Sequence, residues 1–201
     1  MRHLIFAIII TLLAASLCHA RPIAPMEGLE ALRKAFTGIT DFTAEITQEK
    51  RISLMKRGMV MTGQVRFRKP DLFLMEINPP YAGKTLLRDT VIEQETSAGS
   101  GRNRIVLPPE QGLKRWFDKL ALPVASLPEG VTVLADRTGA VYTLTIAPKG
   151  TGMVKELIVT FLENGTIRRL VINERNGDRA TMTFKNVRCN TGLTNRDFRL
   201  E

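Results

Sequence analysis

The sequence predicts a mainly β protein with some helix, in which one antiparallel sheet curls into a barrel or half-barrel. Apolar residues recur at every second position through most of the chain after residue 41, as in strands that bury one face. Turn signals such as Glu163-Asn164-Gly165 and Asn176-Gly177-Asp178 join consecutive strands. Strands that are joined by such short turns have no crossover helix between them, so they should pair antiparallel with their neighbours in sequence, and strand twist should curl the sheet.

The first 20 residues have the pattern of a cleavable export signal. A basic start precedes an apolar run from Leu4 to Leu17, and small residues lead up to Ala20. The run is about 14 residues, shorter than the roughly 20 that span a bilayer. We expect cleavage after Ala20 and a periplasmic protein. Acylation of Cys18 is the alternative, but Leu17 stands where a lipoprotein signal has a small residue.

Residues 21–201 have a length typical of one domain, and their chemistry is restricted. Both histidines, His3 and His19, lie in the signal, and Cys189 is the one cysteine beyond it. These absences exclude histidine-dependent triads, histidine metal sites and an internal disulfide. Carboxylates on one strand face, Glu45 with Glu49 and Glu93 with Glu95, favour solvated surface over catalysis. We expect neither an enzyme nor a cofactor or metal.

The formal net charge is +9, and such a basic surface can indicate what kind of partner the protein binds. Anionic lipid headgroups and acidic proteins both suit a basic surface, and a generally basic envelope protein is the simplest interpretation. Nucleic acid is the least favoured partner, because the chain is exported and has no basic helix with interleaved aromatic residues.

Two helices are predicted, over residues 26–39 and 109–122, where apolar residues recur at three- and four-residue steps. Period-two alternation and turn signals predict the strands, which are 42–47, 59–68, 72–78, one or two within 85–96, 104–107, 131–135, 141–147, 154–162, 166–173 and 179–187.

One face of the early strands is apolar and carries several methionines. Its members are Ile46, Met59, Met61, Val65, Phe67, Phe73, Met75 and Ile77. Methionine is adaptable and suits a site for flexible acyl chains. Ordinary core packing explains the same pattern and is the commoner cause of it.

Several ordered motifs resemble the LolA family of periplasmic lipoprotein carriers. The N-terminal set comprises Phe42, Ala44, Thr47-Gln48, Gly63, Phe67, Lys69-Pro70-Asp71-Leu72-Phe73 and Pro79 or Pro80. The C-terminal set comprises Asn164-Gly165-Thr166-Ile167, Thr181-Met182-Thr183-Phe184 and Leu193-Thr194-Asn195-Arg196-Asp197-Phe198. The middle region, 85–128, matches least well.

The resemblance implies an incomplete antiparallel β-barrel of about 9–11 strands, lidded by short helices around an apolar cavity. It implies a monomeric carrier that takes acylated lipoproteins from an inner-membrane release complex to an outer-membrane acceptor. Val65, Phe67, Phe73, Met75 and Ile77 fall where the family lines its cavity. A carrier of another lipid or glycolipid, and a lipoprotein-sensing regulatory domain, remain alternatives on the same fold.

Lys69 departs from the family pattern, which commonly has an arginine before the proline that helps to hold the lid closed. The parity of Lys69 with Val65 and Phe67 points its side chain inward. A lysine ammonium lacks the planar fork of donors of arginine, so we expect a weakened or rearranged lid latch. Arg68 should point outward.

Overall fold

The computed structural model describes residues 20–55, 58–96, 101–150 and 152–200, so all of the predicted signal except Ala20 lies outside the described residues. Its helices are α2 (Pro25–Thr37), η1 (Pro109–Gln111), α3 (Leu113–Ala121) and η2 (Asn195–Asp197). Its strands are β1 (Arg21–Ile23), β2 (Asp41–Arg51), β3 (Met59–Arg68), β4 (Leu72–Ile77), β5 (Gly83–Arg88), β6 (Val91–Thr96), β7 (Arg102–Val106), β8 (Val131–Thr138), β9 (Val141–Pro148), β10 (Val154–Leu162), β11 (Ile167–Glu174) and β12 (Arg179–Cys189).

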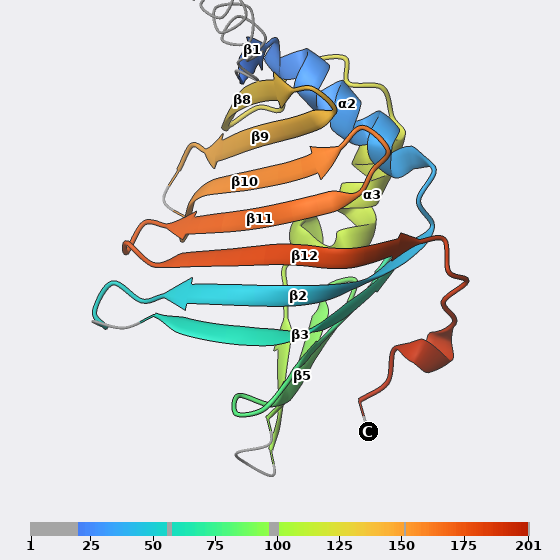
Figure 1. The fold of residues 1–201 in the computed structure, drawn as a ribbon, viewed down its shortest axis with the longest axis vertical. Coiled ribbons are helices and arrows are strands. Elements are labelled where there is room, and N and C mark those ends of the chain that lie inside the picture. The colour runs from blue at the N-terminus through green and yellow to red at the C-terminus, as the bar shows by residue number, and fades with distance from the viewer. Residues whose placement is uncertain (1–19, 56–57, 97–100, 151, 201) are drawn as a thin grey trace, which may run out of the picture.

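All 12 strands belong to one sheet, in the order β1-β8-β9-β10-β11-β12-β2-β3-β4-β5-β6-β7, and the pairings are antiparallel. Figure 1 shows the sheet twisting along its length, with α2 across the ends of the upper strands and α3 behind the middle strands. Within the described residues β1 and β7 each pair with one strand only, so the sheet is open. We call the face that α2 and α3 contact the inner face.

The predicted fold class is confirmed, and the strand count exceeds the expected 9–11. Region 85–96 forms parts of two strands, β5 and β6. The strand β1 was not predicted, because its three residues include Pro22 and are too few to show alternation. It pairs with β8 over Arg137 to Ala135, which extends the sheet by one strand.

Helix α2 lies on the inner face of β8 and β9 because one glycine allows close approach. A Cβ atom added at Gly28 would lie 2.6 Å from Cδ2 of Leu144 and would overlap the Cβ atom of Ala135. Below the helix, Phe161 is fully buried and stacks on Tyr142, with ring centroids 5.5 Å apart. This cluster forms one part of the core and fixes α2 on the sheet.

The outer face of β4 and β5 is also buried, which alternation did not predict. The prediction placed the Phe73 side of β4 inside, yet Leu72 and Leu74 on the other side are the more buried residues. The segment after β12 crosses this outer face and places Phe198, which has no exposed surface, against Leu86. Figure 1 shows this C-terminal segment beside the lower strands.

Asp41 fastens the C-terminal segment to the start of β2. Its carboxylate is buried and accepts hydrogen bonds from the backbone N–H and hydroxyl of Thr191, both at 2.7 Å, and from the N–H of Gly192 at 3.2 Å. Burial by itself raises the pKa of Asp41, but these donors and the Thr40 hydroxyl outweigh burial and leave the pKa below its ordinary value of 3.8.

Replacing Asp41 with Asn should destabilise the fold by about 2 kcal/mol, because an amide supplies one acceptor oxygen where the carboxylate supplies two charged ones. A carboxyl with a lowered folded-state pKa stabilises the protein above about pH 4, and this contribution is lost as pH falls through the lowered pKa. The stability gap between wild type and Asp41→Asn should therefore be full at pH 7 and narrow toward pH 3.

Urea unfolding at several pH values measures this gap. Asp118→Asn, at an exposed position of α3, is the matched control and should leave stability unchanged. A gap for Asp41→Asn that stays constant from pH 7 to pH 3 would contradict the assigned role of the carboxylate.

Candidate functional site

The residues predicted to bind acyl chains share the inner face of β2, β3 and β4. Val65 lies opposite Met75, and Phe67 lies opposite Phe73, in the pairing of β3 with β4. Ile46 and Ile77 both flank Gly63, one from each neighbouring strand. Met59 and Met61 continue the same side of β3 toward its hairpin with β2. The structure therefore brings all eight residues to one continuous surface.

This surface has a deep part and a shallow part. Ile46, Val65 and Phe67 are buried in the core. The remaining five, which are half-buried, are Met59, Met61, Phe73, Met75 and Ile77. The deep residues hold the sheet together whether or not a ligand binds, and the shallow residues are the ones that a ligand could cover.

Helix α3 covers the deep part through Phe117. The Phe117 ring lies 4.9 Å from the Phe67 ring, and Phe67 in turn lies 5.3 Å from Phe42. The first turn of α3 lies against the turn between β5 and β6. There Oδ1 of Asp89 accepts a hydrogen bond from the Lys114 N–H at 3.0 Å. Helical spacing predicted an apolar face for α3, but no sequence signal pointed to Phe67 as the partner of Phe117. The side chains of Trp116 and Leu120 lie outside the described part.

Lys69 links β3 to both helices. Its Nζ donates a hydrogen bond to the Phe36 carbonyl at the end of α2, and it lies 5.7 Å from the centre of the Phe117 ring. Burial lowers the pKa of this ammonium. The inward direction of the Lys69 side chain agrees with the prediction from parity. Among the described residues, Lys69 contacts the two helices through one hydrogen bond and one cation–π contact. Arg68 points outward, as expected, and donates to Leu193 and Asn195 of the C-terminal segment.

The apolar inner face continues beyond the predicted residues onto β10, β11 and β12. Leu170 and Met182 lie opposite each other, Leu170 faces Val159, and Leu157 faces Ile172. These side chains are half-buried. The strands were predicted from the sequence, but their contribution to the same surface depends on the pairing of β12 with β2. That pairing joins distant segments and leaves no local signal.

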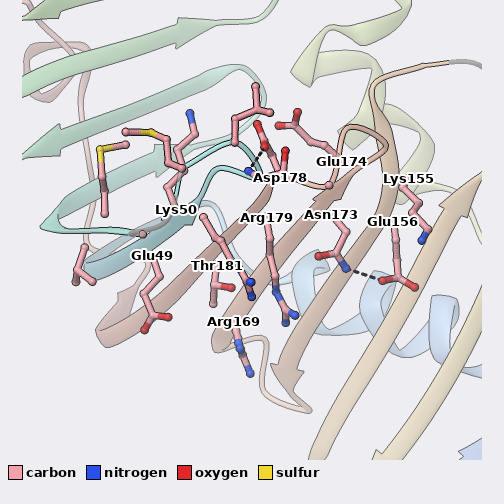
Figure 2. Close-up of a pocket in the computed structure, with 18 residues that line it drawn as sticks. Glu49, Lys50, Lys155, Glu156, Arg169, Asn173, Glu174, Asp178, Arg179 and Thr181 are labelled. Atoms are coloured by element: carbon pink, nitrogen blue, oxygen red, sulfur yellow. Dashed lines mark hydrogen bonds between the residues drawn. The ribbon is translucent and has the colours of Figure 1, made fainter.

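A large pocket of about 1120 Å³ lies at the ends of β2, β3 and β10–β12 (Figure 2). Half of its lining residues are charged, among them Glu49, Arg169, Arg179 and Asp178. Glu49 pairs with Thr181, and the adjacent pair, Gln48 with Met182, lies on the inner face. Because side chains alternate between faces along a strand, Glu49 projects from the outer face. This pocket differs in chemistry and position from the apolar cavity expected between sheet and helices.

The other candidate groups are surface or packing residues. Glu45 and Glu49 are exposed. Glu95 lies opposite Arg102, with 3.8 Å between the charged atoms. Cys189 is half-buried opposite Phe42, and burial together with nearby Asp41 raises the pKa of its thiol. A protonated, half-buried thiol is a weak nucleophile.

In the part of the chain that the structure describes, no helix has the length and apolar character needed to cross a membrane. No curated protein sequence matches this chain.

Several solved structures are similar to this chain over most of its length. A DUF1329 family protein from Desulfovibrio piger is similar over 88% of this chain and 98% of its own, with TM-score 0.51 and 13% identity. A LolA superfamily protein from Nitrosomonas europaea has TM-score 0.46 and 8% identity over 89% of this chain and 98% of its own. The Mycobacterium tuberculosis lipoprotein LppX has TM-score 0.42 and 10% identity over 85% of this chain and 97% of its own.

A family model also matches part of the sequence directly. The match covers residues 116–201, and the family is described as outer membrane lipoprotein carrier protein LolA. These residues include most of α3, the strands β8 to β12 and the C-terminal segment, which contain the second set of motifs. The resemblance to the LolA family is thereby confirmed over residues 116–201, where the C-terminal set of motifs lies, and the N-terminal set falls outside the matched range.

Proposed function

We propose that this protein is a periplasmic carrier that binds the acyl chains of lipoproteins on the inner face of its sheet. The observation that carries the proposal is the half-buried stripe of Met59, Met61, Met75 and Ile77, which continues directly from the buried core. Covering such side chains stabilises a complex by about 25 cal/mol for each Å² of apolar surface removed from water. The methionines can adjust to flexible chains.

Helix α3 is the lid in this proposal. The Phe117 ring lies over Phe67, next to the half-buried stripe, so movement of α3 would extend the surface that an acyl chain can cover. The helix is held by Asp89 at its start and by the contact of Lys69 with Phe117. In this proposal α3 opens and closes over the sheet, whereas α2 stays seated on the core through its close approach at Gly28.

The family description supports lipoproteins as cargo. A monomeric carrier would receive them from an inner-membrane release complex and deliver them to an outer-membrane acceptor. Release needs a site that does not bind too tightly, and a half-buried stripe beside a lid meets this need better than an enclosed cavity would. No covalent chemistry is part of the proposed function.

Glu substitutions at Met61 and Met75 should lower the affinity for a fluorescent triacylated lipopeptide by about tenfold or more, because a carboxylate would face the acyl chains. Thr62→Glu is the matched control, since Thr62 is exposed on the opposite face of β3 and should not affect binding. Thermal unfolding by circular dichroism confirms that each variant is folded. Equal affinity in all three variants would contradict acyl binding on the inner face.

Substitution of Lys69 by Met should speed probe uptake and increase amide hydrogen exchange in α3, because the ammonium contact between the helices is lost. The Phe36 carbonyl retains the N–H groups of Gly38 and Ile39 as donors, so the fold should persist. Lys69→Arg, which keeps the charge and adds donors, should slow both processes. Unchanged exchange in α3 in both variants would rule out Lys69 as the latch.

A further inference from the structure

Exposed apolar side chains gather at one end of the sheet, around the β2–β3 hairpin. Leu54 is 95% exposed, and Met55, Val60 and Met153 are 53%, 62% and 74% exposed. They come from the hairpin and from the β9–β10 turn, which Figure 1 shows at the same end of the strands. We call this surface the hairpin rim and define it as residues 51–55, 58–60, 149–150, 152–155 and 174–179.

The turns of the hairpin rim are fastened to one another. The Ser53 N–H donates to Oδ1 of Asp178 at 2.7 Å, and the Ser53 hydroxyl donates to the Asn176 carbonyl at 2.9 Å. The N–H of Arg175 donates to the Met153 carbonyl at 2.9 Å. The apolar side chains are therefore presented by a braced platform of three turns.

Cations surround these apolar side chains. The described cations of the rim are Arg51, Lys149, Lys155, Arg175 and Arg179, and its described acids are Glu174 and Asp178. Asp178 already accepts hydrogen bonds from Ser53 and Asn176. The guanidinium of Arg175 donates hydrogen bonds to the carbonyls of Gly152 and Pro148. Residues of the rim line the outer-face pocket together with Glu49 and Glu156, which lie farther along the strands.

We propose that the hairpin rim docks on an anionic phospholipid surface. Apolar tips of a few residues can enter the headgroup region of a bilayer while the surrounding cations contact lipid phosphates. The cations favour an anionic partner by charge complementarity. The exposed side chains of Leu54 and Met55 favour a lipid surface over an acidic protein surface, which would leave them without an apolar environment. Four large apolar side chains exposed together at one end also exceed the scattered exposure that soluble surfaces usually show.

Docking would place the inner face next to the membrane. Met59 belongs both to the half-buried stripe and to the edge of the rim, so the stripe extends to the docking surface. In this respect the inference rests on the proposed function, since an acyl chain could pass between bilayer and inner face without crossing water. Membrane contact itself requires no cargo.

Co-sedimentation with vesicles tests the proposal on the full protein without its export signal. Vesicles of phosphatidylethanolamine with phosphatidylglycerol should bind the protein, and vesicles of phosphatidylcholine should bind it much more weakly. Added salt should weaken the binding, because ions screen exposed charges over about 10 Å at 0.1 M. The double variant Leu54→Asp with Met55→Asp should lower partitioning by about tenfold or more.

Leu134→Asp is the matched control, since Leu134 is 59% exposed on β8 and lies outside the rim, and it should bind vesicles as wild type does. Arg51→Gln with Lys155→Gln should weaken binding to anionic vesicles only. The rim variants should keep full affinity for the triacylated lipopeptide, which separates this test from that of the proposed function. Absence of vesicle binding, indifference to lipid charge, or equal loss in Leu134→Asp would overturn the proposal.

Discussion

The pairing of β2 with β12 is the constraint on which the rest of the structure depends. It joins Asp41–Arg51 near the start of the described chain to Arg179–Cys189 near its end, and it unites two runs of strands into one sheet. Among the described residues the one cysteine, Cys189, is free, so no disulfide supports this pairing there. Core packing and the hydrogen bonds of Asp41 to the segment after β12 therefore stabilise this pairing.

Once the two runs are joined, the inner face becomes a continuous apolar surface that two helices cover unequally. Helix α2 is packed tightly against β8 and β9, at a glycine that admits close approach. Among the described side chains of helix α3, Phe117 packs against Phe67, and Asp89 accepts a hydrogen bond from the first turn of the helix. In the proposed function, α2 is the fixed cover of the sheet and α3 is the lid. The half-buried methionine stripe lies next to the second.

Much of this arrangement could be predicted from local patterns. Alternation in β3 correctly assigned Val65 and Phe67 to one face and Arg68 to the other, because the period of a strand fixes side-chain direction. At β4 it placed Phe73 and Met75 on the inner face, but it did not predict that Leu74 on the outer face is buried too, because that burial depends on Phe198 from a distant segment. The contact of Phe117 with Phe67 and the extension of the inner face onto β11 and β12 depend on tertiary pairing. Local sequence carries no signal for such contacts.

Native mass spectrometry with lipid extraction tests the central claim, that the inner face takes acyl chains, most directly. The protein would be purified from the periplasmic fraction of the cells that produce it. The account predicts a population carrying a triacylated lipoprotein, together with an empty one. A bound glycolipid or free lipid would redirect the cargo assignment, and a protein that is consistently empty would contradict the carrier function.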